Sequence, residues 1–483
     1  MKKLQNKMDL KRIFSLIPEV TKPEEKNVGF KTKAKWTLIV LLLFFVLANI
    51  PLFGLSENAL SRFEYLAIIL GTSFGSIISL GIGPIVMASI ILQLLTGSGI
   101  INIDTTTEEG KRFFQGVQKL LVFFFIFFEA VVYVFMQGLQ ASPGFAWLVI
   151  LQLIIGGLAI FYMDDLMQKW GFGSGVSLFI AAGVSLRIIT SAFQFIDTQG
   201  RNCLLSQSVA CPGKVLVIIK SFMSGFGIEA NVALASLIAT ILIFLAVVWA
   251  QSLKVEIPLS YGRVRGYSVK WPLAFFYASV IPVILTAALV ANIQLFGGLL
   301  ENSASHCVEG ACTGFSKIAS HLTFLGHFVN GRAVSGFAYW IDSTRLLELI
   351  IRRSFSWILL LQSLTHTLFF MFFSTLFALF WVKTSGMDAK SQAHNIAASG
   401  LQVAGFRQDI RILESILDRY IIPLTIMGGL AIGLLASIAN LLGALVSGTA
   451  ILLVIMIMFQ FYQNIAKQHA TDMNPALRKF MGS

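Results

Sequence analysis

The chain has 483 residues, of which 56% are hydrophobic and 12% are charged, and its formal net charge is +12. This composition excludes an ordinary soluble domain and indicates a protein that crosses a membrane several times. The positive charge is typical of cytoplasmic loops between membrane spans, where Lys and Arg concentrate, although a basic face could also bind RNA.

The N-terminal residues 1–35 are basic and amphipathic, and they do not have the pattern of a cleavable signal peptide. We therefore expect a cytoplasmic N-terminus and a first span at residues 36–53. This orientation determines on which side of the membrane each later loop lies. The predicted location is the cell (cytoplasmic) membrane.

The next apolar stretch, residues 65–95, is uncharged and longer than one span needs, and several glycines and Pro84 interrupt it. We expect a short half-helix at residues 63–74 and a full span at residues 77–95. A broken segment survives in a membrane only where it is buried in protein or lines a cavity. The chain is therefore predicted to enclose a cavity.

Eight further spans are predicted, at residues 120–136, 145–163, 174–195, 230–250, 272–295, 355–382, 420–441 and 442–461. The fold class is thus all-α and polytopic, with ten spans. Its predicted segments are an N-terminal half (36–196), an external loop (197–228), a C-terminal half (229–463) with cytoplasmic loops at 251–271 and 383–419, and a cytoplasmic tail (464–483).

All four cysteines, Cys203, Cys211, Cys307 and Cys312, fall in long loops that this topology places outside. An even number of cysteines on the oxidising side favours disulfides, and pairing within each loop is the simplest of three connectivities. Free thiols are the alternative. A zinc site is disfavoured because the spacing is irregular; it would use His306, His321 and His327.

Few residues inside the spans suggest chemistry. The glycine-rich residues 170–177 follow no strand and lead into a span, so close helix packing explains them better than phosphate binding. Asp164 and Asp165 are interpreted as a solvated loop edge and not as an ion site. Charged or ionisable groups inside spans are costly and usually functional, and three occur: Glu129, Arg187 and His366.

Sparse intramembrane acids argue against an ion-coupled transporter, and no catalytic constellation points to an enzyme. An apolar constriction can seal a pore without any polar ligand. The residues by themselves are compatible with two classes of protein, a channel and a transporter. No cofactor and no metal ion are expected.

The motif LGIGPIV, residues 80–86, resembles the SecY family, and similar stretches recur along the whole chain, in its archaeal and eukaryotic form. They lie at residues 17–26, 50–54, 93–101, 171–184, 255–266, 281–297, 400–407 and 438–453. The resemblance implies two pseudo-symmetric inverted halves and a re-entrant plug. It also implies the central pore subunit of the Sec protein-conducting channel, which passes unfolded secretory polypeptides across the membrane and releases transmembrane segments sideways into lipid.

The resemblance also assigns roles to residues. It maps a hydrophobic pore ring onto Ile82, Val86, Val176, Ile180, Ile284 and Leu453. The plug residues would be Phe63, Tyr65, Ile68, Ile69, Gly71 and Phe74. Glu129 would line a lateral gate with Met87 and Val280, two apolar residues where the family often has polar ones. Arg263, Arg265 and Arg407 would dock the ribosome through ribosomal RNA phosphates.

The partners implied are a SecE (gamma) subunit, a small beta subunit, the ribosome with its nascent polypeptide, and membrane lipid. The signal recognition particle receptor is an open candidate. The chain has no Walker loop, so the driving force would come from a partner. The rival hypothesis is an inverted-repeat secondary transporter of a small solute; a structural scaffold is a third.

Overall fold

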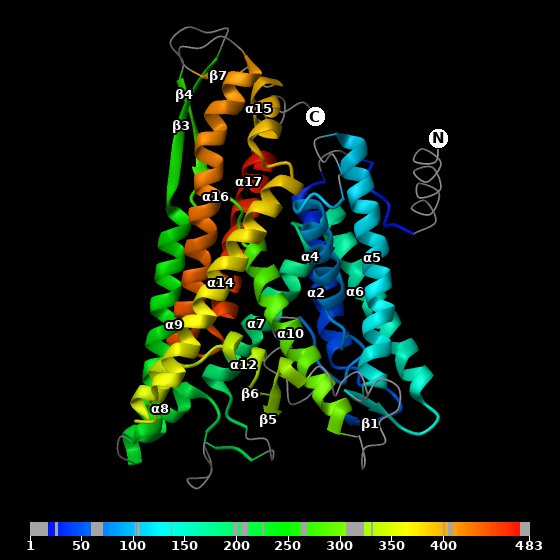
Figure 1. The fold of residues 1–483 in the computed structure, drawn as a ribbon, viewed down its shortest axis with the longest axis vertical. Coiled ribbons are helices and arrows are strands. Elements are labelled where there is room, and N and C mark those ends of the chain that lie inside the picture. Colours follow the sequence, from blue (N-terminus) through cyan, green and yellow to red (C-terminus); the bar gives the residue numbers. More distant parts are fainter. Residues whose placement is uncertain are drawn as a thin grey trace.

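The computed structural model describes residues 18–24, 28–58, 71–101, 103, 107–136, 138–196, 201–203, 211–224, 227–261, 268–305, 323–329, 332–398, 401–403 and 409–473. Long helices run roughly parallel to the vertical axis in Figure 1 and form one bundle. Eight helices in these residues are long and apolar enough to cross a membrane. The prediction of an all-α polytopic protein is confirmed.

The helices that correspond to the predicted spans are α2 (Phe30–Ala48), α4 (Gly83–Gly97), α5 (Glu108–Phe135), α6 (Ala146–Trp170), α7 (Gly175–Phe193), α9 (Ile228–Ser252), α10 (Ile281–Ser305), α14 (Trp357–Thr384), α16 (Ile410–Leu441) and α17 (Gly448–Met473). In Figure 1, α2, α4, α5 and α6 lie on one side, and α9, α14 and α16 on the other. Helices α7 and α10 lie between these groups, and α4 contacts both α10 and α14.

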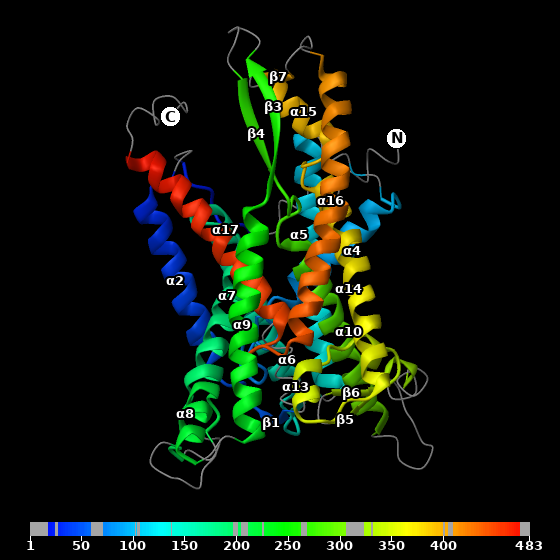
Figure 2. The ribbon, with the colours of Figure 1, turned by 90° about the vertical axis from the view of Figure 1, so that its left-hand side faces the viewer.

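Shorter elements cover the two ends of the bundle. The upper end in Figures 1 and 2 carries β3 (Lys254–Tyr261), β4 (Ser268–Ala274), β7 (Leu401–Val403) and α15 (Ala389–Ala398). The lower end carries β1 (Leu55–Asn58), β2 (Leu139–Ala141), α8 (Lys214–Ser224), η2 (Thr323–Leu325), β5 (His327–Val329), β6 (Arg332–Ser335), α12 (Phe337–Ile341) and α13 (Leu346–Ile351).

At three of the predicted span boundaries, backbone pairing or glycine overrides apolar composition. Residues 272–274 belong to β4, which pairs antiparallel with β3, so the seventh span begins only at Ile281. The second span begins at Gly83, since Pro84 suits the first helical turn. The tenth begins at Gly448, after a turn in which Gly443 has a φ of +63°.

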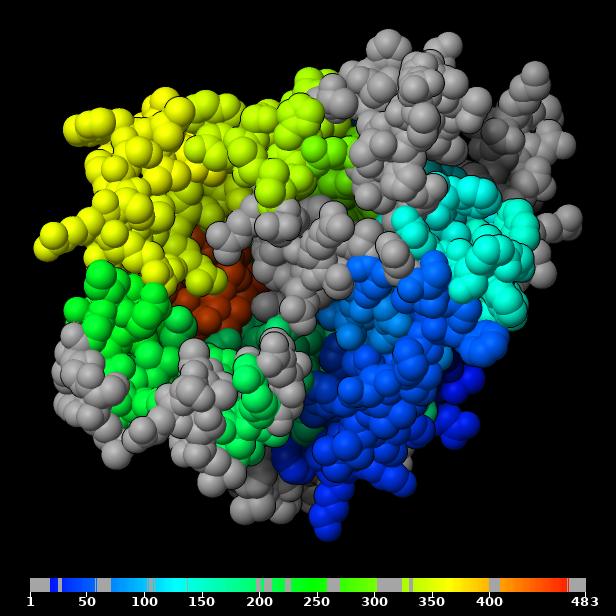
Figure 3. All heavy atoms as spheres, turned by 90° about the horizontal axis from the view of Figure 1, so that it is seen from below, coloured from blue at the N-terminus to red at the C-terminus, as the bar shows by residue number. Residues whose placement is uncertain are grey.

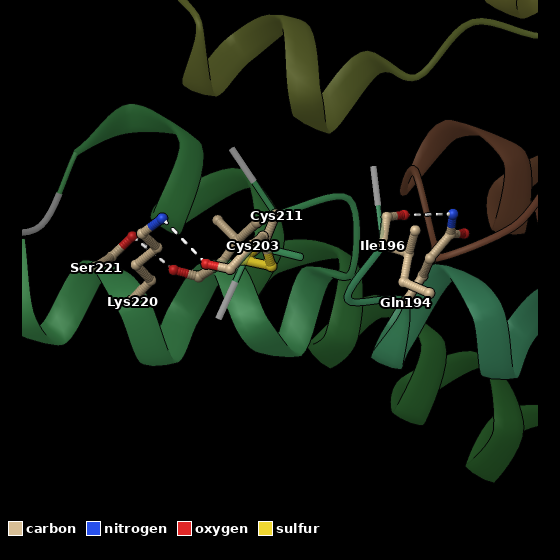
Figure 4. The surroundings of a disulfide bond; sticks show 7 residues. Gln194, Ile196, Cys203, Cys211, Lys220 and Ser221 are labelled. Atoms are coloured by element: carbon tan, nitrogen blue, oxygen red, sulfur yellow. Dashed lines mark hydrogen bonds between the residues drawn. A yellow bond between two sulfur atoms is a disulfide. The ribbon is translucent and has the colours of Figure 1, made fainter. Parts of the chain in front are cut away.

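A disulfide fastens the loop between α7 and α9 at the lower end (Figure 4). Cys203 and Cys211 are bonded to each other and buried, and they pack against Leu216 and Val217 of α8. Lys220 of α8 donates to the carbonyl oxygen of Cys203 over 3.5 Å. The disulfide therefore closes the loop on itself, and packing and a hydrogen bond hold the closed loop against α8. Cys307 and Cys312 lie outside the described residues.

The zinc hypothesis gains no support from the part of the chain that the structure describes, because it holds no group of three or more metal-ligating side chains. The Nδ1 atom of His327 instead lies 3.2 Å from a carboxylate oxygen of Glu301. His306 and His321 lie outside the described residues.

The described residues 18–24, here called the N-terminal strap, are tied to the upper ends of α5 and α6. The Glu19 carboxylate lies 2.6 Å from Lys119 and 3.4 Å from Lys169. The N–H of Val20 donates to Asp165 over 3.0 Å. The hydrogen bond from the Lys119 ammonium lowers the pKa of the Glu19 carboxyl below its ordinary value of 4.5.

The substitution Glu19→Gln should loosen the N-terminal strap, because it removes both ion pairs. Each exposed pair contributes about 0.2–1 kcal/mol, so losing both should accelerate amide hydrogen exchange at Val20 by about 30-fold at most. The folded state lowers the Glu19 pKa, so its contribution exists above pH 4.5 and is lost as the pH falls through the lowered value. Well below that pH, the variant and the wild type should exchange equally. Glu24→Gln is the matched control, and equal rates for all three chains at pH 7 would contradict the assignment.

Candidate functional site

The six residues predicted to form the pore ring, here called the aliphatic ring, lie on or beside α4, α7, α10 and α17 inside the bundle. The predicted ring residues all belong to the large apolar cluster, and five of them are almost fully buried, with only Val176 partly exposed. The five are Ile82, Val86, Ile180, Ile284 and Leu453. None of these side chains can form a hydrogen bond. The ring can therefore exclude water and ions without binding any particular group.

Cavities lie on both sides of this ring. The upper cavity has a volume of about 210 Å³, and Val86, Val176 and Ile284 form part of its wall. The lower cavity has a volume of about 610 Å³ and is lined by polar groups that include Arg187 and Gln362. Figure 3 shows a hollow in the lower face between the residues of α13, in yellow, and those of α9, in green.

Two helices run past the ring from one cavity to the other. On α7, Val176 lines the upper cavity, Ile180 is fully buried, and Arg187 lines the lower cavity. On α17, Gly448 lines the lower cavity, and Gln460 lines the upper one, with the ring residue Leu453 between them. The geometry is that of two cavities, each with polar groups in its wall, with apolar ring residues of α7 and α17 between them.

The segment before α4 is unwound, and Gly71 at its described end lies beside the ring residue Ile82. Gly71 has a φ of +53°, and a Cβ added there would lie 3.5 Å from Ile82. Phe74 lies in a turn and packs against the apolar cluster. The other predicted plug residues, Phe63, Tyr65, Ile68 and Ile69, lie outside the described residues.

The predicted lateral-gate residues lie around the seam between α4 and α10. Glu129 of α5 is 1% exposed, and neither carboxylate oxygen has a hydrogen-bond partner among the described residues. A Cβ added to Gly83 would lie 3.1 Å from that carboxylate, which therefore lies beside the first turn of α4. The positive end of the α4 dipole favours a negative group there. Val280 is buried and Met87 is partly buried.

The interpretation of Asp164 and Asp165 as a solvated edge is wrong, since both are buried. Asp164 Oδ1 accepts a hydrogen bond from the N–H of Val176 over 3.0 Å, and Oδ2 accepts one from Gln168 over 2.8 Å. A Cβ at Gly175 would lie 2.7 Å from the Cα of Asp164. The glycine lets α6 and α7 approach closely, and the carboxylate caps α7 at the residue that enters the ring.

Polar residues that the sequence analysis did not assign line the upper cavity. They are Ser89, Gln93, Gln118, Gln168, Ser174, Ser177, Gln460 and Asn464. The sequence feature that could have identified these residues is a carboxamide inside an apolar span, such as Gln93 in residues 77–95. Uncharged side chains carry less desolvation cost than charges, and they did not stand out from the composition.

His366 has a structural role in a polar network at the lower end of α14. Its Nδ1 atom lies 2.7 Å from the carbonyl oxygen of Ile341, and its Nε2 atom lies 3.3 Å from Nδ2 of Asn440. Asn440 also accepts the N–H of Thr449 over 3.0 Å. The network joins α14, α16 and α17 below the ring.

The predicted docking residues Arg263, Arg265 and Arg407 lie outside the described residues. The strands beside their loops are described, and they pair in one sheet of order β4-β3-β7. Leu259 of β3 pairs with Val403 of β7. The sheet thus joins the two predicted cytoplasmic loops into one projecting unit, which Figure 2 shows at the upper end.

We expect Asp164→Leu to destabilise the junction of α6 and α7, because the Val176 N–H and the Gln168 amide both lose their acceptor. An unsatisfied buried group costs about 1–3 kcal/mol. Thermal unfolding in lipid nanodiscs should show the loss, whereas Asp164→Asn should lose less because its amide oxygen can still accept from Val176. If both variants were as stable as the wild type, the conclusion that Asp164 caps α7 would be wrong.

Comparison with known proteins agrees with this geometry. The SecY family model matches residues 76–462, and the plug domain of Sec61p matches residues 42–75. The protein translocase subunit SecY of Methanothermobacter thermautotrophicus is 41% identical over 99% of each chain.

Solved structures agree as well. One, titled "The structure of a protein conducting channel", is 37% identical, covers 96% of this chain and 98% of its own, and has a TM-score of 0.78. Another, of Sec61 in the canine ribosome-channel complex from the endoplasmic reticulum, is 36% identical with the same coverage and has a TM-score of 0.75. The expected archaeal and eukaryotic resemblance is confirmed, and the chain belongs to the SecY family.

Proposed function

We propose that this protein is the central pore subunit of a Sec protein-conducting channel. It passes unfolded secretory polypeptides across the membrane and releases transmembrane segments into lipid. The observation that carries the proposal is the buried aliphatic ring, which lies between two cavities along α7 and α17. The SecY family membership supports it, since the similar solved structure is titled as a protein-conducting channel.

In this function the ring seals the resting pore and adapts to any passing side chain. Dispersion contacts with aliphatic groups are weak individually and do not select for a partner, so many sequences can pass. The plug residues would add a second seal on the lower side. The position of Gly71 beside Ile82 supports this, because the described end of that segment lies next to the ring.

The lateral gate would open along the seam where α4 and α5 face α10 and α14. Gly97 of α4 and Phe380 of α14 are in tight contact across this seam. Glu129 lies beside the first turn of α4, so movement of α4 would change the surroundings of its carboxylate. A segment of about twenty apolar residues would leave sideways because lipid is its more favourable environment.

The upper end of the bundle is proposed to face the cytoplasm. It carries the N-terminal strap and the β4-β3-β7 sheet, whose adjoining loops hold Arg263, Arg265 and Arg407. Arginine suits the phosphates of ribosomal RNA. The similarity to Sec61 in a ribosome-channel complex supports ribosome docking there.

A SecE subunit and a small beta subunit are further proposed partners, and the signal recognition particle receptor is another. The described helices leave large apolar side chains exposed on α2 and α9 that lipid or a partner helix would cover, among them Leu42 and Trp249. The chain would act as a passive conduit and not as an enzyme, with energy supplied by a partner. Its relatives are named as translocase subunits, and this disfavours the solute-transporter alternative.

Site-specific photocrosslinking tests the proposed function. A photoreactive amino acid at Ile82, Ile180 or Ile284 should crosslink to a ribosome-stalled secretory chain, because all three positions belong to the ring. Leu42, which is 58% exposed on α2, is the matched control and should crosslink to lipid or a partner instead. Crosslinks from Leu42 but from none of the ring positions would refute a polypeptide path through the ring.

Charge reversal at Arg263 and Arg407 should weaken ribosome binding. We expect a loss of about fivefold or more at low salt that shrinks as salt is added, because salt screens exposed charges. Co-sedimentation with ribosomes measures the binding, and Arg201→Glu at the lower end serves as the control. Binding that stays at the wild-type level throughout the salt series would exclude both residues from the docking surface.

A further inference from the structure

Helix α17 is fastened at its two ends to different halves of the bundle. At its lower end, Thr449 exchanges two hydrogen bonds with Asn440 of α16, over 2.7 and 3.0 Å. The N–H of Leu445, in the turn before α17, donates to Thr240 of α9 over 3.1 Å. Both partners belong to the C-terminal half, so the lower end of α17 is fixed within its own half.

The upper end of α17 is fastened to the N-terminal part of the chain instead. The Nε2 atom of Gln468 donates to the carbonyl oxygen of Val28 over 2.7 Å, and its Oε1 atom accepts from Lys33 of α2 over 2.7 Å. The carbonyl can only accept and the ammonium can only donate, so the orientation of this carboxamide is fixed. One turn earlier, Asn464 donates to the carbonyl oxygen of Phe172, between α6 and α7, over 3.4 Å. We call these three contacts the upper joint.

Close packing surrounds the upper joint. A Cβ added to Gly173 would lie 3.6 Å from the ring of Phe461, so the glycine lets α17 lie close to the connection between α6 and α7. The rings of Phe30 and Phe172 are 5.2 Å apart, and Val28 is buried. The hydrogen bonds are therefore partly shielded from water, which raises the cost of breaking them.

The aliphatic ring takes its residues from both halves, so its closure depends on how the halves are held. Ile180 lies on α7, Leu453 lies on α17, and the two helices contact each other. Dispersion contacts between aliphatic side chains favour no particular axial position. A polar contact between packed helices does fix their register, because a slip leaves its groups unpaired. The upper joint supplies such contacts to α17.

A shift at the upper joint would pass directly to the ring. Asn464 is separated from Leu453 by about 16 Å of continuous helix. On the other side, Asp164 accepts from Val176 and packs against Gly175, so the start of α7 is held firmly beneath Phe172. Movement of Phe172 past α17 would therefore move the ring residues of α7 past Leu453.

We propose that Gln468 is a positioning residue for the aliphatic ring. Through the upper joint it holds α17 in register with α2 and α7, so that Leu453 and Ile180 close the resting pore together. The inference rests on the proposed function, because it assumes that the ring seals a pore. It adds a residue outside the ring that sets how tightly the seal closes.

The upper joint and the proposed lateral gate lie on different sides of the molecule. Figure 2 shows α17 beside α2 on one side of the bundle and α4 beside α14 on the other. The contact of Gly97 with Phe380 across the gate seam is apolar, whereas the upper joint is polar. The joint can thus hold one side of the bundle while the seam on the other side separates.

Potassium efflux from liposomes that contain the full-length protein tests the proposal. Gln468→Leu removes both hydrogen bonds of the carboxamide, so it should raise the efflux rate per molecule about three- to tenfold, as expected where bonds of modest net strength hold the sealed state. Gln463→Leu is the matched control and should leave efflux unchanged. Gln463 also lies on α17, and its side chain makes no hydrogen bond in the part of the chain that the structure describes.

A double substitution separates positioning from a purely structural role. Leu453→Ala should itself raise efflux, because it removes atoms from the ring. Adding Gln468→Leu should then raise efflux by a smaller factor than it does in the wild type, since the side chain that Gln468 positions is already missing. Thermal unfolding verifies that each variant is folded. If Gln468→Leu does not fold, Lys33→Met removes one bond of the joint from the other side and should raise efflux about two- to fivefold.

Wild-type efflux from a folded joint variant would overturn the proposal, and so would effects of Gln468→Leu and Leu453→Ala that multiply in full. In either case a leak from Leu453→Ala would still show that the ring seals a pore, and the proposed function would stand. If neither Leu453→Ala nor Ile180→Ala raises efflux, the sealing ring and the positioning role of Gln468 both fail.

Discussion

The architecture depends on satisfying the backbone of one unwound segment inside a membrane. Residues 71–82 are not helical, so their N–H and C=O groups lack the partners that a helix would provide. Neighbouring hydroxyls and backbone supply them: Thr72 donates to Ile78, Gly75 donates to Ser79, and Leu52 donates to Gly75. Gly156 of α6 leaves room for Ile77 to approach its backbone. This local network lets α4 begin at Gly83, inside the bundle, and places Ile82 in the ring.

The same principle recurs at α7, where a carboxylate replaces the hydroxyls. Asp164 caps α7, and Gly175 allows the close approach that the cap needs. Helices α4 and α7 therefore both begin at a glycine and carry ring residues at or near their first turns. A rigid start is useful because an apolar constriction of a few side chains tolerates little error in their position.

Composition and the interruptions in apolar runs were sufficient to predict the long helices, their order and the interruption before α4, but residues 71–74, predicted to end a half-helix, are not helical. They could not locate the start of α10, because Val255, Leu259 and Leu273 are apolar in strands as they would be in a helix. Contacts between distant elements were also hidden. Asp164 was interpreted as a loop residue because its contact with α7 is not visible in the sequence. The same holds for the hydrogen bond by which Gln118 of α5 contacts Ser89 of α4. The ring assignment came from the family resemblance, since one buried isoleucine looks like another in sequence.

The disulfide between Cys203 and Cys211 has a consequence for how each copy of the protein matures. In the proposed orientation, with the upper end in the cytoplasm, the loop between α7 and α9 lies outside, where thiols oxidise more readily than in the reducing cytoplasm, so this bond forms after the loop has crossed. A molecule inserted upside down would keep both thiols. The bond therefore marks molecules with the correct topology. The ratio of disulfide to dithiol in a membrane preparation measures the proportion of correctly oriented molecules.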